Sequence, residues 1–100
     1  MHNPIEANEL LNRMNAGENL NLLDVRGAME FHTYNIGGKN VPLPALAKNT
    51  GKTGYNKTDE IIVICKVGLR SKTAVGILKD VGFENVRNLT GGLIALRRLN

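Results

Sequence analysis

The residues best suited to chemistry in this chain gather in one stretch, "CKVGLRS", from position 65 to position 71. Cys65 is the only cysteine among the 100 residues, and it directly follows the apolar run "IIVI". A cysteine thiolate is a strong nucleophile, and nearby cations lower the pKa of a thiol below its free value of about 8.5. Lys66 and Arg70 supply two cations close to the sulfur. The stretch therefore predicts a nucleophilic cysteine.

Only five residues, 66–70, lie between Cys65 and Ser71, so the backbone of this segment must turn tightly. Gly68, in its middle, can adopt a positive φ and let the backbone turn tightly. If the segment curls, its N–H groups converge above the sulfur and add to the unpaired donors of a helix that begins near Ser71. Such a cradle favours negative charge. We expect the substrate-binding residues to be Lys66, Val67, Gly68, Leu69, Arg70 and Ser71.

A purely structural interpretation of the same residues is open as well. Free cysteine is among the most buried residue types, so Cys65 could be an inert member of the core. Lys66 and Arg70 could be solvated charges at the start of a helix. Cations at a helix N-terminus oppose the helix dipole, however, so we expect an anion to compensate them. With the loop attached, the catalytic interpretation of Cys65 is favoured.

Asp24 and Arg26 end another predicted strand and are expected mainly to support the structure. Arg26 is predicted to pair with Glu30, four residues further on. A supporting role at the pocket is the second interpretation for Asp24 and Arg26. His2 and His32 are expected near the N-terminus and on a surface helix, and neither is predicted to act as a base for Cys65.

Hydrophobic periodicity predicts strands that alternate with helices. The expected elements are a helix over 5–18, a strand over 20–25, a helical turn over 28–34, a strand over 39–43, a strand over 60–65, a helix over 71–81 whose apolar face is Ala74, Ile77, Leu78 and Val81, a strand over 85–89 and a helix over 91–99. The segment 48–60 is the most typical of a loop. Short, continuous apolar strands of this kind indicate a parallel sheet covered on both faces.

We therefore predict a single α/β domain over residues 1–100. Its architecture is three layers, α/β/α, with a central, mostly parallel sheet of four to five strands. In open parallel sheets, ligands bind beyond the carboxyl ends of the strands, where Cys65, Asp24 and Arg26 are expected.

Composition limits the class of partner and the compartment. The net charge is +4, but the 13 Lys and Arg are scattered and aromatic residues make up 4%, which argues against a nucleic-acid surface and leaves a small anion open. No segment reaches the ~20 apolar residues of a membrane span, and no signal-peptide pattern opens the chain. One cysteine fits a reducing compartment, so we expect a cytoplasmic location. We also expect a monomer, because the chain is short and leaves no apolar stripe over.

Four stretches resemble the rhodanese family of sulfurtransferases, in the same order along the chain. "CKVGLRS" resembles the active-site loop Cys-x-x-Gly-x-Arg-Ser of its single-domain members. "LLDVRGAMEF" is similar to an Asp-Val-Arg segment followed by Glu and an aromatic residue. "NIGGKNVPL" and "VRNLTGGLIAL" resemble the family's Gly-Ala-x-Asn-Ile-Pro-Leu strand and its closing Asn-Leu-x-Gly-Gly turn and helix. Together they cover the chain from about Leu10 to Leu96.

The chain also departs from the family pattern. Tyr34, Asn35 and Ile36 stand where the family usually has Gly-His-Ile, and Leu96 replaces a common tryptophan. The family's first strand, which would fall near residues 2–4, is expected to be short or absent. These departures concern the sheet edges and the pocket rim, and none of them touches the loop.

The resemblance implies a two-step sulfur transfer without a metal or organic cofactor. The Cys65 thiolate would take a sulfur atom from a small anionic donor such as thiosulfate, and backbone N–H groups from Lys66 to Ser71 would hold the resulting persulfide. Cyanide, a thiol or a protein acceptor would then remove that sulfur. Lys66 and Arg70 would orient the dianion, and a cation at Lys66 favours thiosulfate over mercaptopyruvate.

Three alternatives remain open. The same Cys65 would serve a protein-to-protein persulfide carrier, which would differ from an enzyme only in its partners. A non-catalytic binding module is less favoured, because inactive members of the family usually lose the cysteine. Phosphatase relatives have five residues between Cys and Arg, whereas this chain has four, which suits a single sulfur atom better than a phosphate.

Overall fold

A four-stranded parallel sheet runs through the computed structural model, which describes residues 3–99. Its strands are β1 (Leu22–Asp24), β2 (Lys39–Asn40), β3 (Glu60–Ile64) and β4 (Asn85–Asn88), in the spatial order β2-β1-β3-β4. Every adjacent pair is parallel. The predicted parallel sheet is therefore confirmed, while the expectation for His2 lies outside the described residues.

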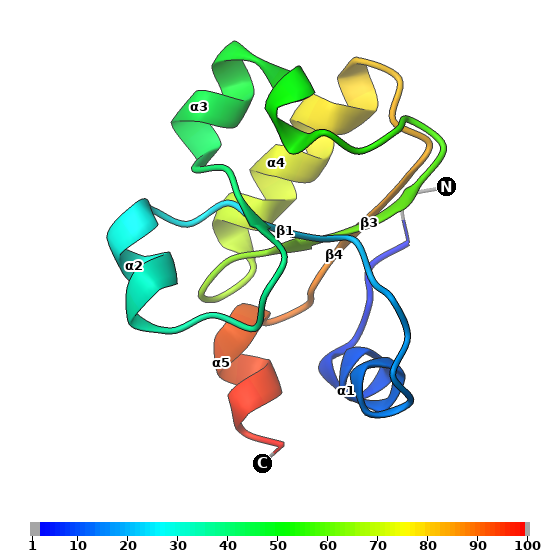
Figure 1. Ribbon diagram of the computed structural model, residues 1–100, viewed down its shortest axis with the longest axis vertical. Coiled ribbons are helices and arrows are strands. Elements are labelled where there is room, and N and C mark those ends of the chain that lie inside the picture. The colour runs from blue at the N-terminus through cyan, green and yellow to red at the C-terminus, as the bar shows by residue number, and fades with distance from the viewer. Residues whose placement is uncertain (1–2, 100) are drawn as a thin grey trace.

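Helices cover both faces of this sheet (Figure 1). They are α1 (Ala7–Asn15), α2 (Ala28–Thr33), α3 (Leu43–Lys48), α4 (Leu69–Asp80) and α5 (Gly92–Arg97), with a short 3₁₀ helix η1 over Thr50–Thr53. Side chains of α3 and α4 pack in one core cluster and those of α1 and α5 in another. The predicted three-layer α/β/α architecture is confirmed. None of the helices in this part of the chain has the length and apolar content needed to span a bilayer.

The central strand β3 explains why its sequence is apolar throughout. Ile61 and Val63 face the α3 and α4 side, whereas Ile62 and Ile64 face the α1 and α5 side, and all four are fully buried. A strand covered on both faces needs apolar residues at every position. Cys65 continues the alternation and belongs to the α3 and α4 cluster. The fold thus places the sulfur at the carboxyl end of β3, at the edge of a core.

The region after β2 differs from its prediction. The strand predicted over 39–43 ends at Asn40, and α3, which was not predicted, begins at Leu43. Pro44 lies in the first turn of α3, where its missing N–H has no helical acceptor to lose. Leu46 of α3 is fully buried. Two prolines favoured a strand end, but tertiary packing of Leu46 stabilises a helix there.

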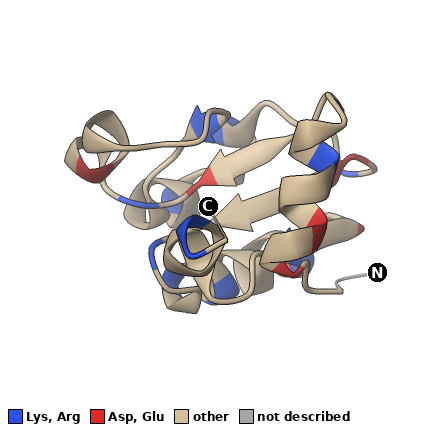
Figure 2. Cartoon of the chain, turned by 90° about the horizontal axis from the view of Figure 1, so that it is seen from below, with Lys and Arg blue, Asp and Glu red and all other residues tan. Residues whose placement is uncertain are grey.

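One smaller expectation, for Val81, is revised, and another, for the first strand, is confirmed. Val81 is 41% exposed because α4 ends at Asp80, and Phe83 fills the core beyond the helix instead. The family's first strand is reduced to a single parallel bridge between Ile5 and Leu89, in line with the expected shortening. Lys and Arg are spread over several elements, as the sequence indicated (Figure 2).

The turn at Gly37 and Gly38 provides a test of how closely the chain before β2 approaches β1. Both glycines have a positive φ, +98° and +82°. A Cβ at position 37 would meet no atom within 4 Å, whereas one at position 38 would lie 2.5 Å from the Leu22 Cβ and 2.6 Å from its carbonyl oxygen. We expect Gly37→Ala to cost about 1 kcal/mol of unfolding free energy and Gly38→Ala at least ~2–3 kcal/mol. Urea unfolding of both variants measures this, and equal losses would contradict the close approach.

Candidate active site

The Cys65 sulfur lies inside a tight loop that donates hydrogen bonds to it. The backbone N–H of Gly68 lies 3.1 Å from Sγ and that of Ser71 lies 3.4 Å from it. The Ser71 hydroxyl is 3.3 Å from the same sulfur. Gly68 has a φ of +95° and occupies the N-cap position of α4, so the chain reverses there and the helix starts beside the sulfur. The sulfur is 1% exposed, yet it is surrounded by donors.

These contacts stabilise the thiolate. Burial by itself raises the pKa of the Cys65 thiol, because a charged sulfur loses its hydration. The contact with the Ser71 hydroxyl and the hydrogen bonds donated by the backbone N–H groups of Ser71, Gly68 and Val67 act in the opposite direction and outweigh burial. The pKa of Cys65 therefore lies below its ordinary value, and the thiolate is more abundant at neutral pH than in a free cysteine.

The other side of the loop is held by the start of α5. The N–H groups of Leu93 and Ile94 donate to the carbonyls of Cys65 and Lys66, at 2.9 and 3.1 Å. The first turn of α5 thus satisfies the loop carbonyls, while donors further along the loop reach the sulfur. Gly91 and Gly92 lead directly into this contact.

Asn88, at the end of β4, is a site residue that the sequence did not indicate. Its Oδ1 accepts a hydrogen bond from the Ser71 hydroxyl, and its Nδ2 donates to the Gly68 carbonyl at 3.3 Å. One side chain therefore contacts both residues whose N–H groups reach the sulfur. The available signal was the position of Asn88 at the carboxyl end of a strand, next to β3 in the sheet.

Arg70 finds its anionic partner within the protein. Its guanidinium makes a bidentate pair with the Glu30 carboxylate, at 2.6 and 3.0 Å. Hydrogen bonding to Arg70 lowers the pKa of Glu30 to about 2, so the pair stays ionised down to strongly acidic pH. Glu30 lies on α2, 40 residues before Arg70. The anion expected beside this helix start is therefore a carboxylate of the chain.

The predicted pair between Arg26 and Glu30 is wrong as an ion pair. Arg26 pairs with Asp24, with Nη2 2.8 Å from Oδ2 and Nε 3.0 Å from Oδ1. Asp24 is fully buried and needs a cation close by, whereas the Glu30 carboxylate is already engaged by Arg70. Arg26 also donates to the backbone carbonyls of Glu30 and Tyr34, at 3.4 and 2.6 Å. It thereby fixes α2 against the end of β1.

The remaining loop side chains are exposed or half-buried. Val67 is 47% exposed and Leu69 is 69% exposed, so any role of theirs at the sulfur falls to their main chain. Lys66 lines a groove of about 410 Å³ together with Arg26 and Glu30. Within residues 3–99, the charged side chains of Lys66 and Arg70 make no hydrogen bond to Sγ. The structure brings together Cys65, Gly68 and Ser71. The charged side chains of Lys66 and Arg70 do not take part in these contacts with the sulfur.

The parallel sheet with helices on both of its faces agrees with comparisons to known proteins. The sequence model of the Rhodanese-like domain family matches residues 6–98, so the chain belongs to this family. The rhodanese-like domain of the Anabaena sp. Alr3790 protein, solved by NMR, superposes with a TM-score of 0.87 at 27% identity, covering 100% of this chain and 76% of that one.

Two curated relatives carry names that refer to sulfur. "Putative sulfur carrier protein YrkF" of Bacillus subtilis is 35% identical over 82 residues, which are 81% of this chain and 43% of the relative. "Probable adenylyltransferase/sulfurtransferase MoeZ" of Mycobacterium tuberculosis is 29% identical over 92 residues, or 91% of this chain and 24% of the relative. The chain therefore spans less than half the length of these two relatives.

Replacing Ser71 tests the origin of the shifted thiol pKa. Ser71→Ala removes the hydroxyl that contacts Sγ but leaves the backbone donors, so we expect the pKa of Cys65 to rise. The rate of alkylation by iodoacetamide, followed against pH, should then reach its plateau at a higher pH than in the wild type. Thr73→Ala, which removes an exposed hydroxyl from the same helix, should leave the profile unchanged. Superimposable profiles for wild type and Ser71→Ala would refute the assignment.

Proposed function

We propose that this protein transfers sulfane sulfur through a persulfide on Cys65. The observation that carries the proposal is the set of N–H donors from Gly68 and Ser71 on a buried, reactive sulfur. A terminal persulfide sulfur is an anion, and such a ring of donors suits an anion at or beside Sγ. Membership of the rhodanese-like family supports sulfur transfer in general. The choice of thiosulfate as donor is part of the proposal.

In the first step, the Cys65 thiolate attacks the outer sulfur of thiosulfate. A bond forms between Sγ and that sulfur, and the sulfur–sulfur bond of thiosulfate breaks. Its electron pair leaves with sulfite, so the total charge is conserved. The lowered pKa of Cys65 supplies the nucleophile at neutral pH, and the loop N–H groups stabilise the negative charge that remains on the bound sulfur.

In the second step, an acceptor nucleophile attacks the outer sulfur of the persulfide. The bond to Sγ breaks, and its electron pair returns to Cys65 as a thiolate. Cyanide would leave as thiocyanate, and a thiolate would leave as a persulfide. Covalent catalysis of this kind gives ping-pong kinetics. The chemistry needs no further oxidant or reductant, and it requires the reduced cysteine that a cytoplasmic setting would maintain.

Lys66 is the proposed cation for the donor. Arg70 was expected to share this task, but its guanidinium is engaged by Glu30. Its proposed role is therefore to hold α2 against the loop and to contribute positive potential near the sulfur. Lys66 has no carboxylate within ion-pair distance in the described part of the chain, so its ammonium group is available to an incoming dianion.

A protein-to-protein sulfur carrier is the second candidate function. The name of YrkF, with 35% identity to this chain, favours it. It would use the same persulfide and differ only in receiving or delivering the sulfur through a partner protein. The phosphatase alternative is less supported, because the loop has four residues between Cys65 and Arg70 and its arginine is paired internally. The lowered pKa of Cys65 argues against the non-catalytic alternative, because an inert cysteine needs no stabilised thiolate.

The persulfide can be weighed directly. After incubation with thiosulfate and removal of the excess, the wild-type protein should gain the mass of one sulfur atom, and dithiothreitol should remove it. Cys65→Ser should gain nothing, because a hydroxyl does not form a stable bond to sulfane sulfur under these conditions. A wild type that gains no mass from thiosulfate or from any other sulfane donor would overturn the proposed function.

Turnover with cyanide tests the role of Lys66. Lys66→Ala should raise the KM for thiosulfate about tenfold, equivalent to ~1.4 kcal/mol of binding, with a smaller effect on kcat. The KM of the wild type should also rise with salt, because exposed charges are screened. Lys72→Ala removes an exposed lysine from the first turn of α4 and serves as the control. Equal KM values for the two variants would exclude Lys66 as the donor site.

A further inference from the structure

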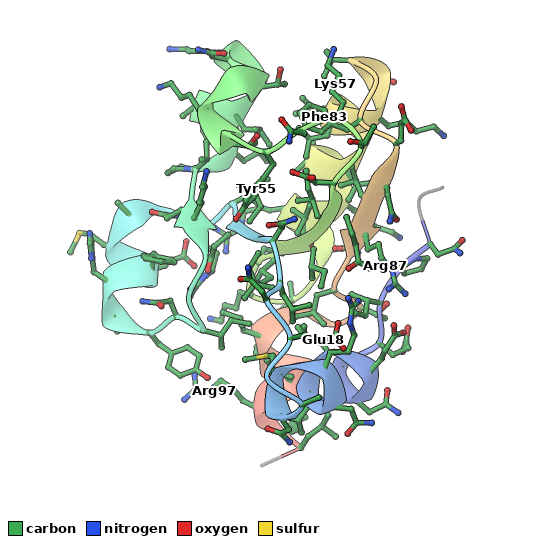
Figure 3. The ribbon with its side chains drawn as sticks, turned by 45° about the vertical axis from the view of Figure 1, so that its right-hand side comes forward. Glu18, Tyr55, Lys57, Phe83, Arg87 and Arg97 are labelled. Atoms are coloured by element: carbon green, nitrogen blue, oxygen red, sulfur yellow. The ribbon has the colours of Figure 1, made fainter. Side chains whose placement is uncertain are left out.

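The groove beside Lys66 has a second wall that the proposed donor chemistry does not use. It lies between α2 and α5, and Tyr34, Ile94 and Arg97 line it together with Arg26, Glu30 and Lys66. Figure 3 shows Arg97 reaching from α5 toward α2. Its guanidinium carbon lies 4.3 Å from the centroid of the Tyr34 ring. Stacking on an aromatic ring holds a guanidinium by its face and leaves the N–H groups at its edge free to bind an anion.

Two of the four charged residues that line this groove are already paired. Arg26 is paired with Asp24, and Glu30 is paired with Arg70. Lys66 and Arg97 have no carboxylate within ion-pair distance among residues 3–99. The groove therefore carries an excess of positive charge at two points, one next to Cys65 in sequence and one on α5.

The position of Arg97 is coupled to the site through Tyr34. The Tyr34 carbonyl accepts a hydrogen bond of 2.6 Å from Arg26, whose partner Asp24 ends β1 beside β3. The Tyr34 ring in turn supports Arg97. A chain of contacts thus runs from the strand ends to the second cation. The larger cavity on the other side of the loop, about 570 Å³, has Glu6 and Lys72 on its walls and no comparable excess of one charge.

The remaining surface of the groove is apolar. Ile94 is half-buried on α5, and Met29 of α2 is 85% exposed at the rim. A volume of about 410 Å³ is within the range of small-molecule sites. The groove fits a small ligand with an apolar body and an anionic end.

We propose that Arg97, stacked on Tyr34, binds the carboxylate of the acceptor, and that the acceptor is a small thiol carrying a carboxylate group. This inference rests on the proposed function. The acceptor loses its proton to solvent, and its thiolate attacks the outer sulfur of the Cys65 persulfide. The bond to Sγ breaks with its electron pair on Sγ, and the acceptor leaves as a persulfide. Arg97 takes no part in these bond changes and acts only by binding.

Two neighbouring arginines provide a matched test. Arg97 and Arg98 are both exposed, but only Arg97 lines the groove. Wild type, Arg97→Ala and Arg98→Ala are loaded with thiosulfate, and the persulfide on each is verified by mass. Each is then mixed with mercaptoacetate or with mercaptoethanol, two thiols of similar size of which only the first carries a carboxylate. Loss of the persulfide is followed by mass at several acceptor concentrations.

We expect Arg97→Ala to raise the half-saturating concentration of mercaptoacetate about tenfold, the loss of one charge-assisted contact. Its reaction with mercaptoethanol should be unchanged, and Arg98→Ala should match the wild type with both thiols. Arg97→Lys should recover part of the mercaptoacetate effect, because it restores the charge without the stacked plane.

The possible failures can be told apart. A wild type that acquires no sulfur would overturn the proposed function, and the acceptor role with it. A wild type that acquires sulfur, but whose mercaptoacetate dependence is shared by Arg97→Ala and Arg98→Ala, would overturn the assignment of Arg97 alone. A persulfide that neither thiol removes would overturn the small-acceptor class and favour a protein acceptor.

Discussion

The site depends on one segment of backbone that is hydrogen-bonded toward two neighbours at once. N–H groups of Gly68 and Ser71 reach the Cys65 sulfur, while the carbonyls of Cys65 and Lys66 accept from the first turn of α5. An ionised group that is 1% exposed would be costly without such donors. Because the dipoles are fixed by the fold, they need no reorganisation when negative charge appears on sulfur. The stabilisation of a thiolate at this cysteine therefore depends first on the main chain.

Internal ion pairs decide which charges remain available to ligands. Asp24 with Arg26 and Glu30 with Arg70 tie α2 to the strand ends and to the start of α4. The Asp24–Arg26 pair is buried. The Glu30–Arg70 pair is half-exposed, so it contributes at most about 1 kcal/mol to stability. Their main consequence is geometric, because they form a groove whose uncompensated cations are those that a donor or acceptor anion can meet.

Much of the architecture could be predicted from the chain itself. The continuous apolar residues of β3 and the periodicity that predicted a helix over 5–18 indicated elements that the structure contains. The helix α3 could not be predicted in this way, since its two prolines fit a turn as well as a first helical turn. Its stability comes from burying Leu46 against α4, a contact between distant segments. Val81 was misplaced for the converse reason, because the helix ends one residue before it.

The sequence by itself determined the position of the single cysteine, the length of the loop after it and the glycine that allows the chain to reverse, since these are local properties of seven consecutive residues. Only the tertiary structure decided that Asn88 holds Ser71 and Gly68, that α5 satisfies the loop carbonyls, and that Arg70 is paired with Glu30. Those contacts join residues many positions apart. Hydrogen bonds and ion pairs depend on distances of a few ångströms, which composition and spacing do not specify until the strands and helices have packed.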